Sequence, residues 1–356
     1  MLAILNKALP LPLSLVLMSA LPSWAASNNE DIPANEDAAT RQIVQMIEES
    51  TRAEAKNGSA SAHRNVHAKA HGCVQAEFRI LNKLPKELQI GIFGEARTYP
   101  AWIRCSNSSG KMQDDSVGDG RGMAIKLMGV EHSESNTQDF IMINHPVFLV
   151  RNAADYVEFQ KDLLENSPVK FFFPGLNPFN FRLHELGIAN AIRSSKVTNP
   201  LSTQYWSMTP YLFGDTAMKF SARACDAASL LVKKTFSPDF LRENMQKHLA
   251  QNEACFDFLV QLRKHPDQMP IEDPTVEWNE KDSPFIPVAR IIIPPQKFDS
   301  PMQLNFCENL SFTPWHTIPE HRPLGGINRV RKTVYDTMSR VRHELNSVER
   351  LEPTAF

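Results

Sequence analysis

The sequence has few cysteines, and none of them form a CxxC pair. The five are Cys73, Cys105, Cys225, Cys255 and Cys307. Their spacing excludes a zinc ribbon and covalent haem attachment through CxxCH. Most are expected to be buried small hydrophobic residues, and a single disulfide is open, but sequence alone does not assign its partners.

Several other signatures are also missing. The sequence contains no GxGxxG motif, no P-loop, no repeat period and no GxSxG motif, so neither a dinucleotide-binding fold nor a serine hydrolase is supported. Charge of one sign is not in excess either: 38 Lys and Arg oppose 40 Asp and Glu, for a formal net charge of −2. Nothing in this balance indicates nucleic acid or an anionic membrane as a partner.

The N-terminus lacks the roughly 20 apolar residues that a membrane span needs. Lys7 is the only charged residue before Glu30, and the apolar run 8–21 contains two prolines. The run leads into the small residues around Ala25, a pattern typical of a cleaved secretory signal. We therefore expect residues 1–25 to be a signal peptide, the protein to be periplasmic or secreted, and no stable membrane insertion.

With 42% hydrophobic and 22% charged residues, the rest of the chain has the composition of an ordinary globular protein. Residues 26–60 are expected to form a polar, flexible leader over 26–36 and a helix over 38–55, where apolar residues recur at helical spacing. No linker follows, so 61–356 is predicted to be one domain.

Within that domain, short strands come mostly before helices. Alternating or β-rich segments predict strands at 74–80, 101–106, 122–128, 139–150 and 288–293. Helices are expected at 153–166, 237–265 and 329–345. This order favours an α+β fold with an antiparallel sheet or barrel.

The last predicted helix carries a chemically suggestive stripe. Arg331, Tyr335 and Arg342 are spaced four and seven residues apart, so their side chains share one side of the helix. A guanidinium one turn from a phenol favours the phenolate, which is a hard donor suited to ferric iron. Taken alone, however, such a helix is more often an ordinary amphipathic helix.

Five sequence blocks, taken in their order along the chain, give a more specific indication of the protein family. They are RNVHAKAHG at 64–72, AWIRCS at 101–106, DGRGMAIK at 119–126, DFIMINHPVFLVR at 139–151 and RxxxYxxxxRxR at 331–342. Together they resemble the haem catalases, and the segments 205–210 and 321–325 are closest to the shorter, catalase-like haem peroxidases. The resemblance implies an antiparallel β-barrel with surrounding helices and a bound haem b.

The resemblance also implies roles by position. On the distal side of the haem it places His67, Asn144 and Ser106, the last as the hydrogen-bond partner of the histidine. Tyr335 is implied as the axial iron ligand, with Arg331 as its charge partner. The residues implied at the haem propionates and at one haem face are Arg64, Arg104, Arg342 and Tyr156.

The chain departs from full-length catalases in several places. Cys105 replaces an aromatic residue, the residues around Asn144 differ, and the sequence ends about ten residues after the haem helix. We therefore do not expect a nucleotide cofactor, and a homo-oligomer remains open.

The function expected from these features is that of an exported haem peroxidase that reduces hydrogen or organic peroxides with a small electron donor. Three alternatives stay open: a genuine catalase, an enzyme that converts fatty-acid hydroperoxides, and a non-catalytic haem carrier. A carrier would need Tyr335 but no distal proton shuttle such as His67.

Overall fold

The structure is a computed structural model that describes residues 30–56, 62–230, 237–350, 352–353 and 356. The predicted signal peptide, 1–25, lies outside the described residues. Within the described residues, no helix is both long enough and apolar enough to cross a bilayer.

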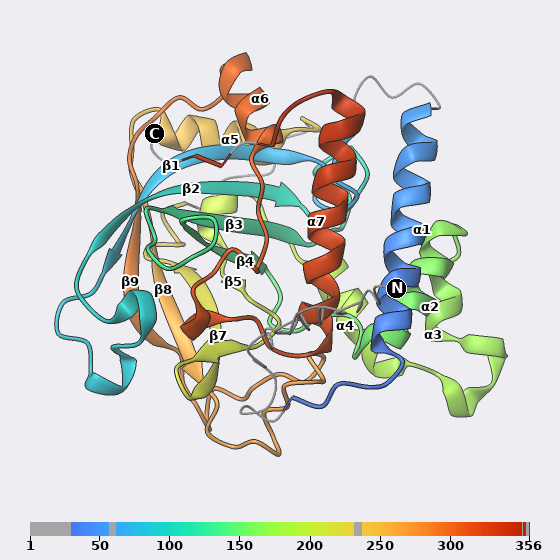
Figure 1. The fold of residues 1–356 in the computed structure, drawn as a ribbon. Coiled ribbons are helices and arrows are strands. Elements are labelled where there is room, and N and C mark those ends of the chain that lie inside the picture. Colours follow the sequence, from blue (N-terminus) through green and yellow to red (C-terminus); the bar gives the residue numbers. More distant parts are fainter. Residues whose placement is uncertain (1–29, 57–61, 231–236, 351, 354–355) are drawn as a thin grey trace, which may run out of the picture.

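Nine antiparallel strands form one sheet that closes on itself (Figure 1). The sheet order is β5-β4-β3-β2-β1-β9-β8-β7-β6, and an additional pairing of β5 with β7 closes eight of the strands into a barrel. The strands are β1 Ala70–Ile80, β2 Thr98–Asn107, β3 Arg121–Met128, β4 Thr137–Ile143, β5 Tyr205–Trp206, β6 Tyr211–Phe213, β7 Thr216–Ala224, β8 Ala254–Leu262 and β9 Ile286–Ile293. The predicted α+β fold with an antiparallel barrel is confirmed.

Aromatic side chains fill the inside of the barrel. The ring of Phe258 lies 5.0 Å from that of Phe78 and 4.6 Å from that of Phe140, measured between centroids. Because successive side chains of a strand point to opposite faces, Cys105 belongs to this core, whereas Arg104 and Ser106 point outward. Cys105 is thus a residue of the barrel core.

Seven α-helices surround the barrel in the described part of the chain. They are α1 Glu36–Lys56, α2 Ala153–Leu164, α3 Val169–Phe172, α4 Leu183–Ser194, α5 Phe240–Leu249, α6 Pro301–Asn309 and α7 Gly326–Asn346. Short 3-10 helices lie at Lys86–Leu88, Gly91–Phe93, Pro174–Leu176, Pro178–Asn180, Pro200–Ser202 and Pro319–His321.

Helix α7 lies between the barrel and α1 (Figure 1). Its apolar stripe, which includes Val330 and Val334, packs against Ile43 and Ile47 of α1. The neighbouring stripe of α7 carries Arg331, Tyr335 and Arg342, about one residue step around the helix from the apolar stripe.

Two predicted elements are wrong in part. The predicted helix 237–265 is helix α5 followed by strand β8, in which Ala254, Phe256 and Phe258 alternate into the barrel core. The predicted strand 139–150 ends at Ile143, shortly before Pro146, which has no N–H to donate to a sheet.

The end of the expected leader is anchored. Glu30 forms ion pairs of 2.8 Å with Arg322 and 2.6 Å with Arg329, and Glu36 pairs with Arg329 at 2.6 Å. These part-buried contacts tie the chain just before α1 to the start of α7. The expectation of a flexible leader over 26–36 does not hold from Glu30 onward.

One disulfide is present, between Cys225 at the end of β7 and Cys255 in β8. It links neighbouring strands, and the backbone N–H of Cys225 also donates to the carbonyl of Cys255 at 3.0 Å. Cys73, Cys105 and Cys307 are free and buried. The pairing that the sequence left open is thus assigned.

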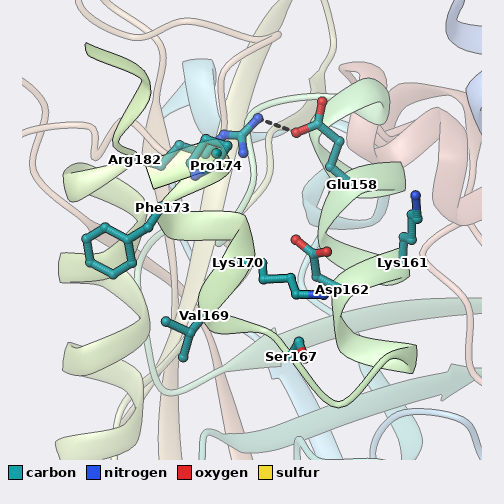
Figure 2. A pocket seen from close by; sticks show the side chains of 10 residues that line it. Glu158, Lys161, Asp162, Ser167, Val169, Lys170, Phe173, Pro174 and Arg182 are labelled. Atoms are coloured by element: carbon teal, nitrogen blue, oxygen red, sulfur yellow. Dashed lines mark hydrogen bonds and ion pairs between the residues drawn. The ribbon is translucent and has the colours of Figure 1, made fainter. Parts of the chain in front are cut away.

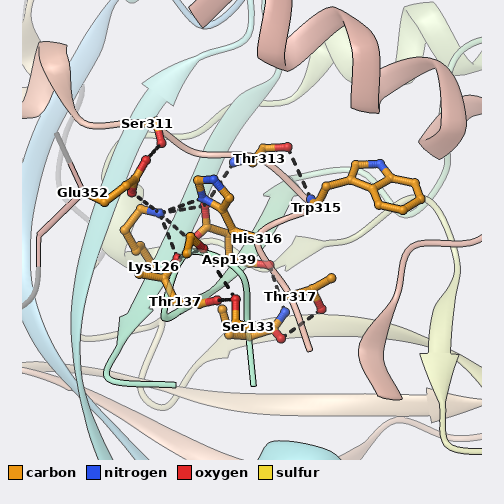
Figure 3. A network of polar contacts seen from close by, with 12 residues as sticks. Lys126, Ser133, Thr137, Asp139, Ser311, Thr313, Trp315, His316, Thr317 and Glu352 are labelled. Atoms are coloured by element: carbon orange, nitrogen blue, oxygen red, sulfur yellow. Dashed lines mark hydrogen bonds and ion pairs between the residues drawn. The ribbon is translucent and has the colours of Figure 1, made fainter. Parts of the chain in front are cut away.

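A buried ion network fixes the segment that leads into α7 (Figure 3). The ammonium of Lys126 lies 2.9 Å from both Asp139 Oδ1 and Glu352 Oε2. Asp139 Oδ2 is 3.1 Å from His316 Nδ1, and Arg350 Nη2 is 3.2 Å from His316 Nε2. Lys126 Nζ also lies 3.0 Å from His316 Nδ1, so both ring nitrogens of His316 take part in the network. The network thus connects segment 313–317 to Asp139, a residue of β4.

Candidate functional site

The predicted site residues gather on the outer face of the barrel, on the side of α7. His67 comes just before β1 with φ of 61°, a backbone conformation that costs a non-glycine residue about 1 kcal/mol or more. Its Nδ1 and the hydroxyl of Ser106 are 3.0 Å apart in a hydrogen bond, and its backbone N–H donates to Ser108 at 3.1 Å. The ring orientation is therefore fixed at one nitrogen, which leaves Nε2 for other partners.

Gly122 makes room for this histidine. A Cβ atom at Gly122 would lie 2.6 Å from His67 Nδ1 and 2.9 Å from Ser106 Oγ, too close for any larger residue. Gly122 stands in the sequence block 119–126, but no role could be predicted for it from the sequence. The sequence signal for this role is the lack of a side chain at position 122. Its importance can be recognised only when the strand register places Gly122 opposite Ser106.

The charge state of His67 follows from its surroundings. Burial, and then the positive charges of Arg104 and Arg331, lower the pKa of His67 to about 3. The imidazole is thus neutral at neutral pH, the form that can accept a proton. The effect of Arg331 also shows that the α7 side of the site faces the histidine closely enough to act on it.

Asn144 is held by two neighbours that the sequence did not single out. Its side-chain carbonyl accepts from the backbone N–H of Arg121 at 2.6 Å, and its amide donates to Ser195 Oγ at 2.9 Å. Arg121 is itself fixed, because its buried guanidinium donates to Asp115 O at 2.9 Å and to the side chain of Asn107. The first two residues of β3 therefore set the positions of both Asn144 and His67.

On α7, Arg331 Nη2 donates to the Tyr335 hydroxyl at 3.2 Å. The guanidinium is buried and also donates to Asn328 Oδ1 at 3.0 Å and Thr209 Oγ1 at 3.3 Å. Burial acts to lower the pKa of Arg331, but the neighbouring Tyr335 and Tyr211 raise it above its ordinary value. A permanently charged donor is thus fixed at the phenol oxygen.

Tyr156 of α2 packs in the same region, against the apolar side of α7. Burial, with a further contribution from Tyr335, raises the pKa of Tyr156 to about 12. Tyr156 is therefore a neutral phenol close to Tyr335.

The three remaining arginines meet at one point. Arg64, Arg104 and Arg342 come from the segment before β1, from β2 and from α7, and all three approach the carboxylate of Glu308. Arg104 Nη2 also donates to the carbonyl of His67 at 2.8 Å, which connects this cluster to His67 and Ser106. The structure thus brings all nine predicted site residues into one region.

The arginine cluster fits a dianionic group. Three guanidiniums face one carboxylate, so two positive charges remain without a counter-charge within the cluster. In addition, Arg104 Nε is buried without a hydrogen-bond acceptor. Buried guanidinium groups call for anionic partners, and the two propionates of a haem would supply them.

A surface pocket of about 890 Å³ lies elsewhere, beside α2 and α3 (Figure 2). Its rim is made of ion-paired side chains, as in the 2.5 Å contact of Arg182 with Glu158. Phe173 lines it, whereas Phe171 and Phe172 are buried in the core. None of the nine predicted residues lines this pocket, so it is not part of the candidate site.

Comparison with known proteins agrees with the fold. The family model described as Catalase matches residues 28–171, which include His67, Ser106 and Asn144 but not α7. No curated protein matches the sequence significantly.

Solved structures of catalases resemble the chain over most of its length. They include a bacterial catalase (17% identity, TM-score 0.63, 85% of this chain and 62% of that chain) and a fungal catalase (17%, 0.63, 82% and 61%). Catalase A from Saccharomyces cerevisiae is 19% identical with a TM-score of 0.64, over 83% of this chain and 65% of that one. The chain thus spans less than two thirds of each of these catalases. The solved structures thus confirm the predicted catalase-like fold, and the family model that matches residues 28–171 agrees with the predicted resemblance to the catalases.

Proposed function

We propose that the protein is an exported, haem-dependent peroxidase of the catalase superfamily that reduces hydrogen or organic peroxides at the expense of a small electron donor. The observation that carries the proposal is the geometry of two pairs: His67 Nδ1 and the Ser106 hydroxyl are 3.0 Å apart, and Arg331 Nη2 donates to the Tyr335 hydroxyl at 3.2 Å. The family match at residues 28–171 supports peroxide as the substrate class.

The distal residues handle the proton. His67 Nδ1 is engaged by Ser106, so Nε2 is the atom that takes a proton from the near oxygen of a peroxide and returns it to the leaving oxygen. A pKa of about 3 keeps this imidazole able to accept. Asn144 uses one amide hydrogen on Ser195, and its second hydrogen can orient the peroxide without titrating.

The α7 residues hold the cofactor. Tyr335 would be the axial ligand of a haem b, and Arg331 would favour its phenolate form through the 3.2 Å hydrogen bond. Arg64, Arg104 and Arg342 would bind the propionates, and Tyr156 would lie near the ring. When bound, the haem supplies the redox chemistry of O–O cleavage, while the chain positions substrate and proton.

Export is supported by two features. The pattern of residues 1–25 is typical of a cleaved signal peptide. The Cys225–Cys255 disulfide favours an oxidising compartment, where such bonds persist.

The first test is the ferric absorption spectrum of the haem-loaded protein and of Tyr335→Phe. Loss of the axial phenolate should change the ligand-to-iron bands of the spectrum, whereas the control Tyr99→Phe, at the far end of β2 from Ser106, should leave them unchanged. An unaltered spectrum in Tyr335→Phe would refute tyrosine ligation.

Turnover then separates the alternatives. Hydrogen peroxide is added with an aromatic donor, and oxygen release and donor oxidation are followed together. Donor oxidation with little oxygen supports a peroxidase, and rapid oxygen release identifies a catalase instead. If haem is bound but neither activity occurs, a fatty-acid hydroperoxide is tried next, and failure there leaves only a haem carrier.

A further inference from the structure

Glu308 occupies the centre of the arginine cluster. Its carboxylate lies 2.9 Å from Arg64 Nη1, 3.6 Å from Arg342 Nη1 and 4.0 Å from Arg104 Nη2. These arginines come from three parts of the chain that are far apart in sequence, and Glu308 is the carboxylate that they share. No role for Glu308 was predicted from the sequence.

The end of helix α6 presents this carboxylate to the arginines. Arg64 Nη2 donates to the carbonyl of Leu310 at 2.6 Å, and Arg342 Nη1 donates to the carbonyl of Glu308 at 2.5 Å. The C-terminal end of a helix carries partial negative charge, which adds to the attraction. Gln303 anchors the same helix to the barrel, because its side-chain amide donates to the carbonyl of Cys73 in β1 at 2.8 Å.

The cluster is electrostatically strained when Glu308 is its only carboxylate. Burial, and then the charge of Arg104, lower the pKa of Arg64 to about 9, and the charge of Glu308 opposes this shift. A carboxylate is therefore needed at this point to keep the guanidiniums together. The Glu308 side chain is 28% exposed, so it has a route to solvent if another anion takes its place.

We propose that Glu308 is an internal substitute for a haem propionate, which holds the arginine cluster together in the haem-free chain and competes with the cofactor for Arg64. The inference rests on the proposed function, since it concerns the same haem. A propionate that enters displaces the Glu308 carboxylate from Arg64 toward solvent, and Glu308 returns when haem leaves. Glu308 thus lowers the cost of the haem-free state and weakens the retention of haem.

A competing glutamate and an ordinary structural ion pair predict opposite effects on the rate of haem release. A structural glutamate stabilises the haem-free and haem-loaded forms alike, so its loss should accelerate the release of haem. A competing glutamate stabilises only the haem-free form, so its loss should slow the release of haem.

The experiment compares wild-type protein, Glu308→Gln and the control Glu344→Gln. Glu344 is an exposed carboxylate of α7 that pairs with Arg52 outside the cluster. Haem transfer to an excess of a haem-scavenging apoprotein is followed by the change in the Soret band, and thermal unfolding of the haem-free proteins is measured in parallel.

We expect haem transfer from Glu308→Gln to be about fivefold slower than from wild type, the scale of one partly exposed ion pair. Haem-free Glu308→Gln should unfold at a lower temperature, and Glu344→Gln should match wild type in haem transfer. Glu308→Asp keeps the charge on a shorter side chain and serves if the glutamine variant does not fold: its haem transfer should be intermediate. Unchanged or faster transfer in the Glu308 variants overturns the inference while the proposed function stands, whereas a wild-type protein that binds no haem refutes both.

Discussion

Replacing Gly122 by alanine tests whether the backbone of β3 sets the position of the distal histidine. The added Cβ would lie 2.6 Å from His67 Nδ1, where ordinary contact begins at 3.4 Å, so the ring must retreat by 0.8 Å. It would also lie 2.9 Å from Ser106 Oγ. Neither neighbour can yield easily, because the two are hydrogen-bonded to each other and His67 already has a positive φ.

Two costs follow from this displacement. Overpacking a rigid site destabilises a protein by about 1–3 kcal/mol. A catalytic group displaced by roughly 1 Å can lose about 10²-fold in rate, and a positioned acid–base contributes about 10²–10⁴-fold in total. We therefore expect Gly122→Ala to consume peroxide about 10²-fold more slowly than wild type while it keeps its haem.

The assay is the initial rate of peroxide consumption at equal haem content, together with the Soret spectrum and the melting temperature. Gly187→Ala is the matched control, since a Cβ there meets nothing within 4 Å and the residue lies within helix α4. That control should keep its rate and gain about 0.5–1 kcal/mol in stability. A Gly122→Ala rate within threefold of wild type would show that His67 is not held by this contact.

Three further predictions concern acid stability, the disulfide and the positioning of Asn144. Because the pKa of His67 is about 3 in the folded protein and near its ordinary 6.5 in the unfolded chain, acid favours unfolding below pH 6.5, by at most about 2 kcal/mol at pH 5. The free energy of unfolding of His67→Gln, measured in urea from pH 7 to 5, should lack this component. Replacing both Cys225 and Cys255 by serine should cost about 3–4 kcal/mol for a loop of 30 residues, and a loss below 1 kcal/mol in urea would contradict that estimate. Ser195→Ala should lower peroxide turnover several-fold without loss of haem, because the Asn144 amide loses one of its two anchors; an unchanged pH–rate profile and rate would remove Ser195 from the site.

The parts of the fold that the sequence predicted are those with a strong local period. The alternation in β1 and the apolar stripe of α7 were sufficient to identify both elements. Strand β8 was taken for the continuation of helix α5, since the segment 254–262 is apolar enough for either structure. Pairing with β7 and β9 decides in favour of a strand, and neither partner is close in sequence.

The candidate site, like the fold, could be predicted from the sequence only in part. Arg331 and Tyr335 could be placed together from their spacing of four residues on a helix. The positions of Gly122, Ser195 and Glu308 could not be predicted, because each acts on a residue more than 50 positions away. Their importance depends on the strand register and on the packing of α6 and α4, which no local pattern contains.

The pairing of β1 with β9 has a consequence for how the protein is made. Residues 77–80 pair with residues 289–292, and Arg64 and Arg342 reach one carboxylate from opposite ends of the described chain. Contacts of such long sequence separation form slowly, and a growing chain cannot complete the arginine cluster until α7 has been synthesised. A partly synthesised chain therefore lacks the complete arginine cluster. A haem that needs this cluster can be captured only after α7 has been synthesised.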